Sequence, residues 1–340
     1  MEKGVSVSEI TENSKVAGVF LVSEASLGTA RNGALYWSLK LSDSTGAIEA
    51  KIWHPLSAAH PRIPRGSLAW VSGRSALYRE KLQLAIDDFS LLPPEVSDSF
   101  DPALFLPSAS IPPDEMFLEL KRLALEEFKY PPWRKFIISI LNDEKIGPSL
   151  KTFPAAKTMH HAYVGGLLEH TLSVFNLCRD FADRYPQLDR QTLLAGAILH
   201  DIGKISEFSG GLANDYTDAG RLSGHIVLGV ALIEPFAQKS GLDDKLKEHL
   251  YHLILSHHGQ YEFGAARLPQ TAEAFALHYA DNLDAKLAQF RNLFNDESGP
   301  EWSDYQKGME RYLYNPFRTP EKRKNEKQLP EFECLSLLKE

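Results

Sequence analysis

The chain has 340 residues, of which 43% are hydrophobic and 24% are charged, and its formal net charge is -8. This composition is typical of globular domains and excludes a collagen-like, coiled-coil or largely disordered chain, and the length favours two domains. The acidic balance argues against a uniformly basic nucleic-acid binder. No run approaches the roughly 18 apolar residues of a membrane span, and the start has no apolar signal core. Two cysteines, Cys178 and Cys334, cannot form a disulfide framework, which indicates a reducing, cytoplasmic compartment.

Residues 14–92 have mainly the alternating pattern of β-strands. The run 35–41 alternates strictly, with apolar Leu35, Trp37, Leu39 and Leu41 on one face and Tyr36, Ser38 and Lys40 on the other. Similar runs at 16–22, 48–53, 68–73 and 82–86 bring the number of short strands to about five. A small closed β-barrel accounts for these strands without leaving exposed sheet edges.

Six prolines between Pro93 and Pro113 predict a semi-rigid linker over residues 93–113. The period then changes to 3.6 residues, so residues 114–317 are predicted to form an all-α domain, with helices only up to about residue 313. Asp114 is expected to cap the first helix. The clearest helices are expected near residues 161–184, 190–201, 221–238, 243–258 and 270–291. The polar, basic segment 318–340 is predicted to be a mobile tail. The fold class is therefore α+β, with a β-barrel followed by an all-α domain.

Ten of the twelve histidines lie between His160 and His278, inside the predicted helical domain. The candidates for a common site are, in chain order, His170, His200, Asp201, His225, His257, His258 and Asp281. Each alone is most simply a surface residue or a hydrogen-bonded core residue, and the paired histidines also suit a helix C-terminus. A shared metal site, however, gives one cause for all of them.

The ligand types restrict the metal. Imidazole and carboxylate without a thiolate suit Mn, Fe, Zn, Ni or Co better than a structural zinc–thiolate site. One metal needs about four protein ligands, so this larger set indicates two metals. An aspartate such as Asp201 has two oxygens and can bridge two cations. Two cations about 3.5–4 Å apart can clamp a phosphate and activate a bridging hydroxide.

The order of these residues resembles the signature of the HD phosphohydrolase superfamily, most clearly in the stretch Leu199-His-Asp-Ile-Gly-Lys204. The additional His225 and His257-His258 resemble its binuclear subset. Over residues 15–318 the chain is further similar to the YhaM-type 3′→5′ exoribonuclease family. This closer resemblance is carried by His160-His161 ahead of His170, by Leu255-Ser-His-His-Gly259, and by the segment 277–286.

The resemblance implies an N-terminal five-stranded OB-fold barrel and an HD-type helical domain. It implies that His170, His200, Asp201 and Asp281 bind a first metal, and that Asp201 bridges to a second metal held by His225, His257 and His258. Mn²⁺ is the expected ion, although Fe²⁺ or Co²⁺ fit the ligands equally well.

The resemblance also assigns roles around the metals. Lys204 is expected to contact the scissile phosphate, although a solvent-exposed lysine at a helix end is the alternative. His160 or His161 is expected to line the substrate cleft, with His161 as the catalytic candidate; a polar helix start is the alternative there. His249, His252 and His278 are interpreted as structural.

The barrel is locally basic. Between Arg31 and Lys81 there are eight basic and three acidic residues, an excess of five positive charges. Tyr36 and Trp53 share strand faces with Lys40 and Lys51, and aromatic platforms beside cations suit single-stranded nucleic acid. The alternative is that Trp53 packs under the following loop and Tyr36 merely fills the barrel surface. RNA rather than DNA comes from the family resemblance.

The favoured function is a metal-dependent exonuclease that shortens single-stranded RNA, and as a second substrate single-stranded DNA, from its 3′ end. A metal-activated hydroxide would release 5′-mononucleotides.

One alternative is an HD-type phosphodiesterase for a small cyclic nucleotide. Against it, the residues after His258 are Gly-Gln-Tyr-Glu-Phe-Gly and lack the Gly-Tyr-Pro element of the cyclic-dinucleotide class. A second alternative is a non-catalytic nucleic-acid-binding protein with a structural metal. No membrane partner is expected, and the sequence does not decide whether the helical domain forms a homo-oligomer.

Overall fold

The structure, a computed structural model, describes residues 2–79, 81–97, 99–106, 109, 111–156, 163–212, 214–294 and 300–316. The chain divides into two compact units, Met1–Asp284 and Ala285–Glu340. His160, His161 and the segment 318–340 lie outside the described residues, so the expectations for them stay predictions. No helix in the described parts of the chain is long and apolar enough to cross a bilayer.

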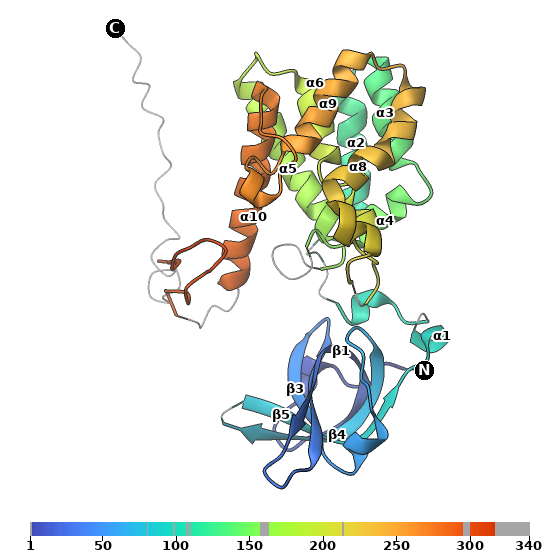
Figure 1. Cartoon of the computed structure of the whole chain (residues 1–340), viewed down its shortest axis with the longest axis vertical. Helices are drawn as coiled ribbons and strands as arrows, with labels where there is room; N and C mark the ends of the chain where they lie inside the picture. The colour runs from blue at the N-terminus through green and yellow to red at the C-terminus, as the bar shows by residue number, and fades with distance from the viewer. Residues whose placement is uncertain are drawn as a thin grey trace. The chain divides into compact units, whose positions relative to one another are not determined.

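The N-terminal strands close into the barrel drawn in blue to teal in Figure 1. The strands are β1 (Lys15–Thr29), β2 (Leu35–Asp43), β3 (Gly46–Ile52), β4 (Leu68–Tyr78) and β5 (Lys81–Leu91), hydrogen-bonded in the closed order β1-β2-β3-β5-β4. Only β3 and β5 pair in parallel. The long β1 closes the barrel because it pairs with both β2 and β4, so that Leu21 lies opposite Ser42 and Leu68. The predicted five-stranded OB-type barrel is therefore confirmed.

The alternation of each strand decides which side chains fill the barrel. In β2, Trp37, Leu39 and Leu41 are buried, and the same alternation buries Ile48, Ala50 and Ile52 in β3. Leu35 departs from the expectation, since it begins β2 and is 47% exposed. The opposite face of β2 and β3 stays on the outside of the barrel and carries Tyr36 and Lys51.

Aromatic side chains of the segment after the barrel pack against the barrel. This segment contains α1 (Pro94–Ser97) and a 3₁₀-helix, Pro102–Leu104. Phe100 and Phe105 are buried against Val19 and Leu68, with their rings edge to face and 5.6 Å apart. The proline content of this segment did not predict that anchoring.

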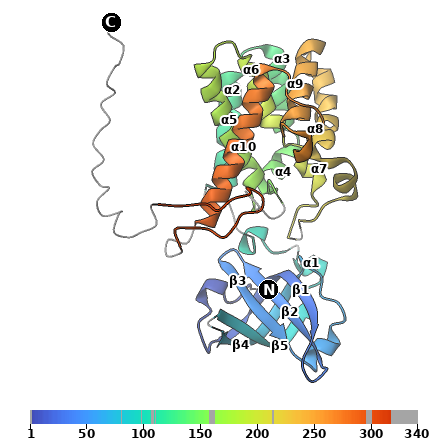
Figure 2. The ribbon, with the colours of Figure 1, turned by 60° about the vertical axis from the view of Figure 1, so that its left-hand side comes forward.

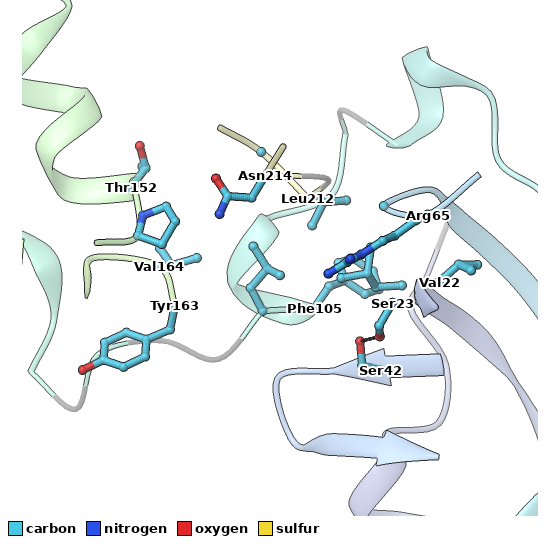
Figure 3. A pocket seen from close by; sticks show the side chains of 15 residues that line it. Val22, Ser23, Ser42, Arg65, Phe105, Thr152, Tyr163, Val164, Leu212 and Asn214 are labelled. Atoms are coloured by element: carbon cyan, nitrogen blue, oxygen red, sulfur yellow. Dashed lines mark hydrogen bonds between the residues drawn. The ribbon is translucent and has the colours of Figure 1, made fainter. Parts of the chain in front are cut away.

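A pocket of about 170 Å³ lies beside Phe105 (Figure 3). Its lining includes Arg65 and the hydroxyl groups of Ser23 and Ser42, which are 2.5 Å apart. None of its lining residues is a predicted metal ligand. The pocket is therefore separate from the histidine chemistry described below.

The helical domain begins at α2. Its helices are α2 (Pro113–Glu127), α3 (Pro131–Leu141), α4 (Ile146–Thr152), α5 (Gly166–Arg184), α6 (Arg190–Leu199), α7 (Lys204–Glu207), α8 (Asp218–Ser240), α9 (Asp244–Ser256) and α10 (Ala272–Leu293). The predicted cap at Asp114 is wrong, because Pro112 holds the N-cap position and Asp114 lies in the first turn. A proline at the first helical position starts the helix with its φ already set. Aspartate and threonine side chains do cap α6, α8 and α9.

The central helix of this domain is α6, which is buried from Thr192 to Leu199. It packs into one apolar core with residues of α2, α3, α5, α9 and α10. Figure 2 shows α10 running beside α5, where His170 meets Asp284. Because α6 is buried on all sides, the His200-Asp201 pair that follows it lies in the interior.

The described residues 300–316 are not helical, so the prediction of helices up to residue 313 is wrong there. Isolated bridges join Trp302 to Tyr314 and Gln306 to Arg311. The aromatic residues of this segment follow cross-strand pairing rather than a 3.6-residue period. The result is a short hairpin, residues 302–314.

Candidate metal centre

The predicted ligands come from five helices or helix ends. His170 lies on α5, His200 caps the end of α6 with Asp201 next, His225 lies on α8, His257 caps the end of α9 with His258 next, and Asp281 lies on α10. Their side chains gather into two groups, His170 with His200 and Asp281, and His225 with His257 and His258. Within each group, one potential ligand atom per residue lies within 4.8 Å of the others.

The first group is compact and buried. Nε2 of His170 lies 3.1 Å from Nε2 of His200 and 3.2 Å from Oδ1 of Asp281. Oδ2 of Asp201 lies 3.5 Å from both of these Nε2 atoms. Two imidazole nitrogens and two carboxylate oxygens therefore face one point, which is the donor set expected for a divalent transition metal.

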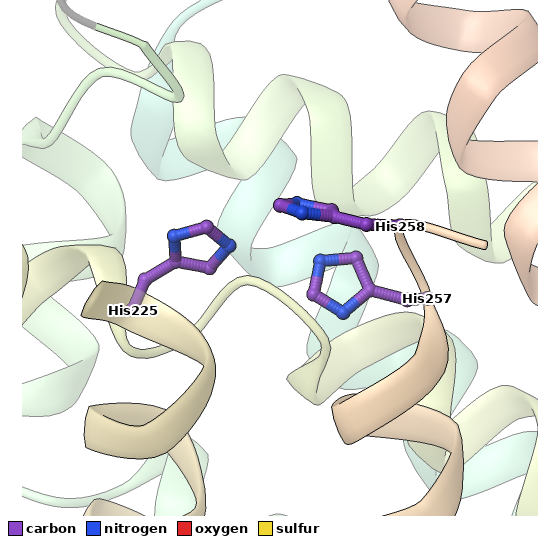
Figure 4. A group of neighbouring side chains, drawn as sticks. All are labelled: His225, His257 and His258. Atoms are coloured by element: carbon purple, nitrogen blue, oxygen red, sulfur yellow. The ribbon is translucent and has the colours of Figure 1, made fainter. Parts of the chain in front are cut away.

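The second group contains three imidazoles that converge from α8 and the end of α9 (Figure 4). Oδ1 of Asp201 lies 3.5 Å from Nε2 of His225 and 3.7 Å from Nε2 of His257. The ring of His258 lies 4.3 Å from that of His257 and 5.1 Å from that of His225. Since Oδ2 of Asp201 faces the first group and Oδ1 faces the second, this carboxylate stands between the two.

Three polar atoms of the second group and one of Asp201 are buried without a hydrogen-bond partner among the described residues. They are Oδ1 of Asp201, Nε2 of His225, Nε2 of His257 and Nδ1 of His258. A buried polar atom without a partner is costly, and a cluster of four aimed at one another needs a common one. A cation accepts lone pairs from all of them, so the residues fit a bound metal.

Hydrogen bonds on the far side of each ring fix which nitrogen faces the centre. Nδ1 of His200 lies 3.0 Å from the carbonyl of Ala197, and Nδ1 of His257 lies 2.7 Å from that of Ile254. A ring that donates through Nδ1 presents the bare lone pair of Nε2 to a metal. Among the described ligands, His258 presents Nδ1 instead.

Two further imidazoles are held from behind by carboxylates, and neither carboxylate was predicted from the sequence. Asp284 lies 2.7 Å from Nδ1 of His170, and its other oxygen accepts from Ser173 at 2.5 Å. Glu207 lies 3.2 Å from Nδ1 of His225. Asp284 had a detectable signal, since it follows the predicted ligand Asp281 by three residues on the same helix. Glu207 had none.

Burial and charge set the protonation of the rings. Burial lowers the pKa of His200, His257 and His258, which keeps these imidazoles in the neutral form that binds metals. Burial alone would also lower the pKa of His170, but its hydrogen bonds to Asp281 and Asp284 raise it to about 10. The pKa of Asp201 is held well below its usual value, against the effect of burial, by Lys204 and the surrounding histidines.

Glycines allow the backbone to bring the second group together. A Cβ on Gly203 would lie 1.9 Å from the carbonyl oxygen of His225, so α8 approaches the chain after Asp201 only because this residue is glycine. Gly224 has φ 70° and ψ 160°, which kinks α8 just before His225. The backbone NH of His225 then donates to Glu207.

Lys204 begins α7 and is largely buried beside the carboxylate of Asp201. Its Nζ lies 2.7 Å from Oδ2 of Asp201. The alternative of a solvent-exposed lysine is wrong, since only 12% of the side chain is exposed. His161, the other predicted catalytic residue, lies outside the described residues.

Three of the predicted nucleic-acid residues, Tyr36, Lys51 and Trp53, lie together on the outside of the barrel, whereas Lys40 lies farther along β2 beside Glu24. The rings of Tyr36 and Trp53 are 5.0 Å apart and tilted by 34°. Nζ of Lys51 lies 5.0 Å from the centre of the Tyr36 ring, and Lys40 lies 3.4 Å from Glu24. Trp53 is 48% exposed, so about half of its side chain surface faces solvent. Gly28 lies directly beneath Tyr36, where a Cβ would be 2.7 Å from the ring.

Comparison with known proteins identifies relatives of the chain. The HD domain family matches residues 167–286. The chain is 35% identical over 317 residues to the 3′-5′ exoribonuclease YhaM of Bacillus velezensis, which covers 93% of this chain and 99% of that protein. It is 36% identical to YhaM of Bacillus subtilis, over 84% of this chain and 89% of the relative. The chain belongs to the YhaM family.

The resemblance predicted from the residues is thereby confirmed, and the YhaM family match extends over both the barrel and the helical domain. Among solved structures, the second OB-fold domain of replication protein A from Methanococcus maripaludis is 24% identical. It covers 26% of this chain and 93% of that one, with a TM-score of 0.23. A mitochondrial single-stranded DNA binding protein from S. cerevisiae, Rim1, is 19% identical, covers 24% of this chain and 97% of that one, and has a TM-score of 0.21.

Proposed function

We propose that this chain is a metal-dependent 3′→5′ exoribonuclease that hydrolyses single-stranded RNA to 5′-mononucleotides. The observation that carries the proposal is the position of Asp201, whose two oxygens face two separate groups of ligand atoms. Membership of the YhaM family supports the substrate and the 3′→5′ direction. Single-stranded DNA is a second proposed substrate.

The proposed first metal site consists of His170, His200, Asp201 and Asp281, and the second of Asp201, His225, His257 and His258. When bound, two divalent cations supply Lewis acidity toward a phosphate and lower the pKa of water. The ligand chemistry is consistent with Mn²⁺, which we propose as the native ion, and with Fe²⁺ or Co²⁺.

Side chains of the protein provide the remaining chemistry. Lys204 places a cation 2.7 Å from Asp201, so a phosphate that reaches the ligand groups also meets an ammonium group. Asp284 and Glu207 hold two of the imidazoles with their Nε2 atoms toward the centre. We also propose His161 as a residue of the substrate cleft.

The barrel is proposed to hold the single strand. Tyr36 and Trp53 offer neighbouring exposed rings, and Lys51 adds a positive charge over Tyr36. In OB folds, the face made by the second and third strands is a common nucleic-acid site; Tyr36 and Lys51 belong to these strands, and Trp53 directly follows the third. The scarcity of cysteines supports a cytoplasmic location, and self-association through the helical domain stays a proposal.

The deciding experiment uses 5′-labelled single-stranded RNA with Mn²⁺. The parent protein is expected to produce a ladder that shortens from the 3′ end and to release 5′-mononucleotides. Asp201→Ala is expected to lose measurable turnover, whereas Asp180→Asn, an exposed aspartate on α5, keeps it. Equal rates for Asp201→Ala and the parent would refute the metal mechanism. Turnover of cyclic dinucleotides without turnover of RNA would favour the small-nucleotide alternative instead.

A further inference from the structure

The hairpin of residues 302–314 carries aromatic side chains that the proposed function has not used. Its arms are joined by the two bridges described above and by a hydrogen bond of 2.9 Å from the NH of Ser303 to the carbonyl of Leu313. Four of its aromatic side chains are exposed, namely Trp302 (58%), Tyr305 (49%), Tyr312 (61%) and Tyr314 (41%). Contiguous exposed apolar surface of this kind indicates an interaction site.

These four side chains form one surface, here called the aromatic face. Tyr312 and Tyr314 are two residues apart on an extended arm, so they point to the same side. Trp302 packs on Tyr314 with ring centres 4.7 Å apart and planes tilted by 32°, and Tyr305 packs on Tyr312 at 5.4 Å. Each ring is held by its neighbour yet keeps one side toward solvent. A flat ligand therefore finds rings that are already positioned.

Positive charge in this part of the chain belongs mainly to the sequence after the hairpin rather than to the hairpin itself. The hairpin has exposed Lys307 and Arg311, and the acidic residues Asp304 and Glu310 offset them. Residues 318–327 contain five basic and two acidic residues. Stacking on the rings is therefore the main attraction that the hairpin offers to a nucleic acid, and Arg311 is an exposed cation beside them.

We propose that the aromatic face is a second binding surface for single-stranded RNA, in addition to Tyr36 and Trp53 of the barrel. The inference rests on the proposed function, since an exonuclease holds the rest of the strand while its end is cleaved. Bases stack on the exposed sides of the two ring pairs, without sequence preference because every base has a π-face. Arg311 contacts the phosphates beside them.

The test compares two double variants of the full chain. Tyr305→Leu with Tyr312→Leu removes two aromatic rings, whereas Tyr305→Phe with Tyr312→Phe keeps them. Affinity is measured by fluorescence anisotropy with a labelled single-stranded RNA of about 16 nucleotides, in a chelator so that no cleavage occurs. The leucine pair is expected to bind about tenfold more weakly. The phenylalanine pair, and Tyr185→Leu, which removes a similarly exposed tyrosine in the helical domain, are expected to match the parent.

Crosslinking of the parent protein gives a measurement that does not depend on any variant folding. RNA containing 4-thiouridine is expected to crosslink to peptides that contain residues 302–314. Crosslinks confined to the barrel would overturn the proposal. A second result would also overturn it: the leucine double variant binds RNA like the parent, but the mass of the protein assembly in solution changes. The aromatic face would then join copies of the chain.

Failure of the proposed function has a different signature. If the parent hydrolyses neither RNA nor bis(p-nitrophenyl) phosphate in Mn²⁺, and RNA still crosslinks to residues 302–314, the nuclease proposal fails and the second binding surface stands.

Discussion

Asp284 holds the imidazole of His170 from the side opposite to the candidate metal, with 2.7 Å between its carboxylate and Nδ1. Ser173 orients the same carboxylate. The arrangement fixes the ring so that Nε2 faces His200 and Asp281. A carboxylate behind a metal-binding histidine positions the ring and increases its basicity.

Replacing Asp284 by asparagine is therefore expected to weaken metal binding without removing a ligand. The loss should be about 10–100-fold in affinity, which is usual for partners of this kind. Activity measured against Mn²⁺ concentration, together with calorimetric titration, would show it. Asp180→Asn on the exposed face of α5 is the matched control. An unchanged metal affinity for Asp284→Asn would show that this contact does not support the site.

Gly203→Ala is expected to impair the second metal site more than the first. The new methyl group would meet the carbonyl oxygen of His225 at 1.9 Å, so α8 must move away from Asp201. Elemental analysis after purification without a chelator should give a ratio of metal to protein below that of the parent. Gly229→Ala is a graded comparison, because its Cβ would lie 3.3 Å from the nearest backbone atom and should be tolerated better. Full metal content in Gly203→Ala would contradict the packing argument.

Trp53→Leu is expected to weaken the binding of single-stranded RNA by roughly tenfold, because one stacked base contributes about 1–3 kcal/mol. Trp53→Phe keeps a ring beside Tyr36 and should retain most of the affinity. Binding is best measured in chelator at one fixed salt concentration, since phosphate contacts depend on salt. Equal losses for the leucine and phenylalanine variants would show that stacking is not the cause.

Asp43 makes the stability of the barrel depend on pH. Burial would raise the pKa of this carboxyl, but hydrogen bonds from Lys3, Thr45 and Val7 lower it below 3.8. Because the folded-state pKa is below the unfolded value, the stabilisation is complete above the unfolded pKa of about 4. It is lost as the pH falls through the folded value.

Asp43→Asn should therefore destabilise the barrel at neutral pH by about 2 kcal/mol, the scale of charged hydrogen bonds. The difference from the parent should shrink in acid. Hydrogen exchange of β2 and β3 at several pH values measures this locally, with the exposed Asp87→Asn as control. A difference that stays constant down to pH 3 would exclude the carboxylate as its source.

The sequence was informative where histidine and aspartate residues recur directly after apolar helical stretches. His200, Asp201, His257 and His258 each follow an apolar stretch, and together with the order of His170, His225 and Asp281 this position selected them as candidates. The strand alternation similarly predicted the barrel. The closure of the barrel through β1 depends on pairing between distant segments, which alternation alone does not specify.

The missed features depend on tertiary contacts. Glu207 is one acidic residue among many, and only the packing of α7 on α8 brings it to His225. The need for glycine at position 203 is visible only in the structure, where the carbonyl of His225 lies beside it. The hairpin of residues 302–314 has aromatic spacing that fits no simple period, so its cross-strand pairs were not predicted.

The candidate ligands come from α5, α6, α8, α9 and α10 or from the residues at their ends, and this origin has a consequence for the amount of folded enzyme as well as for its rate. Such a centre exists only when all five helices are in place, so metal binding adds directly to the free energy of folding. A shortage of the metal would therefore reduce the amount of folded protein as well as the turnover of each molecule.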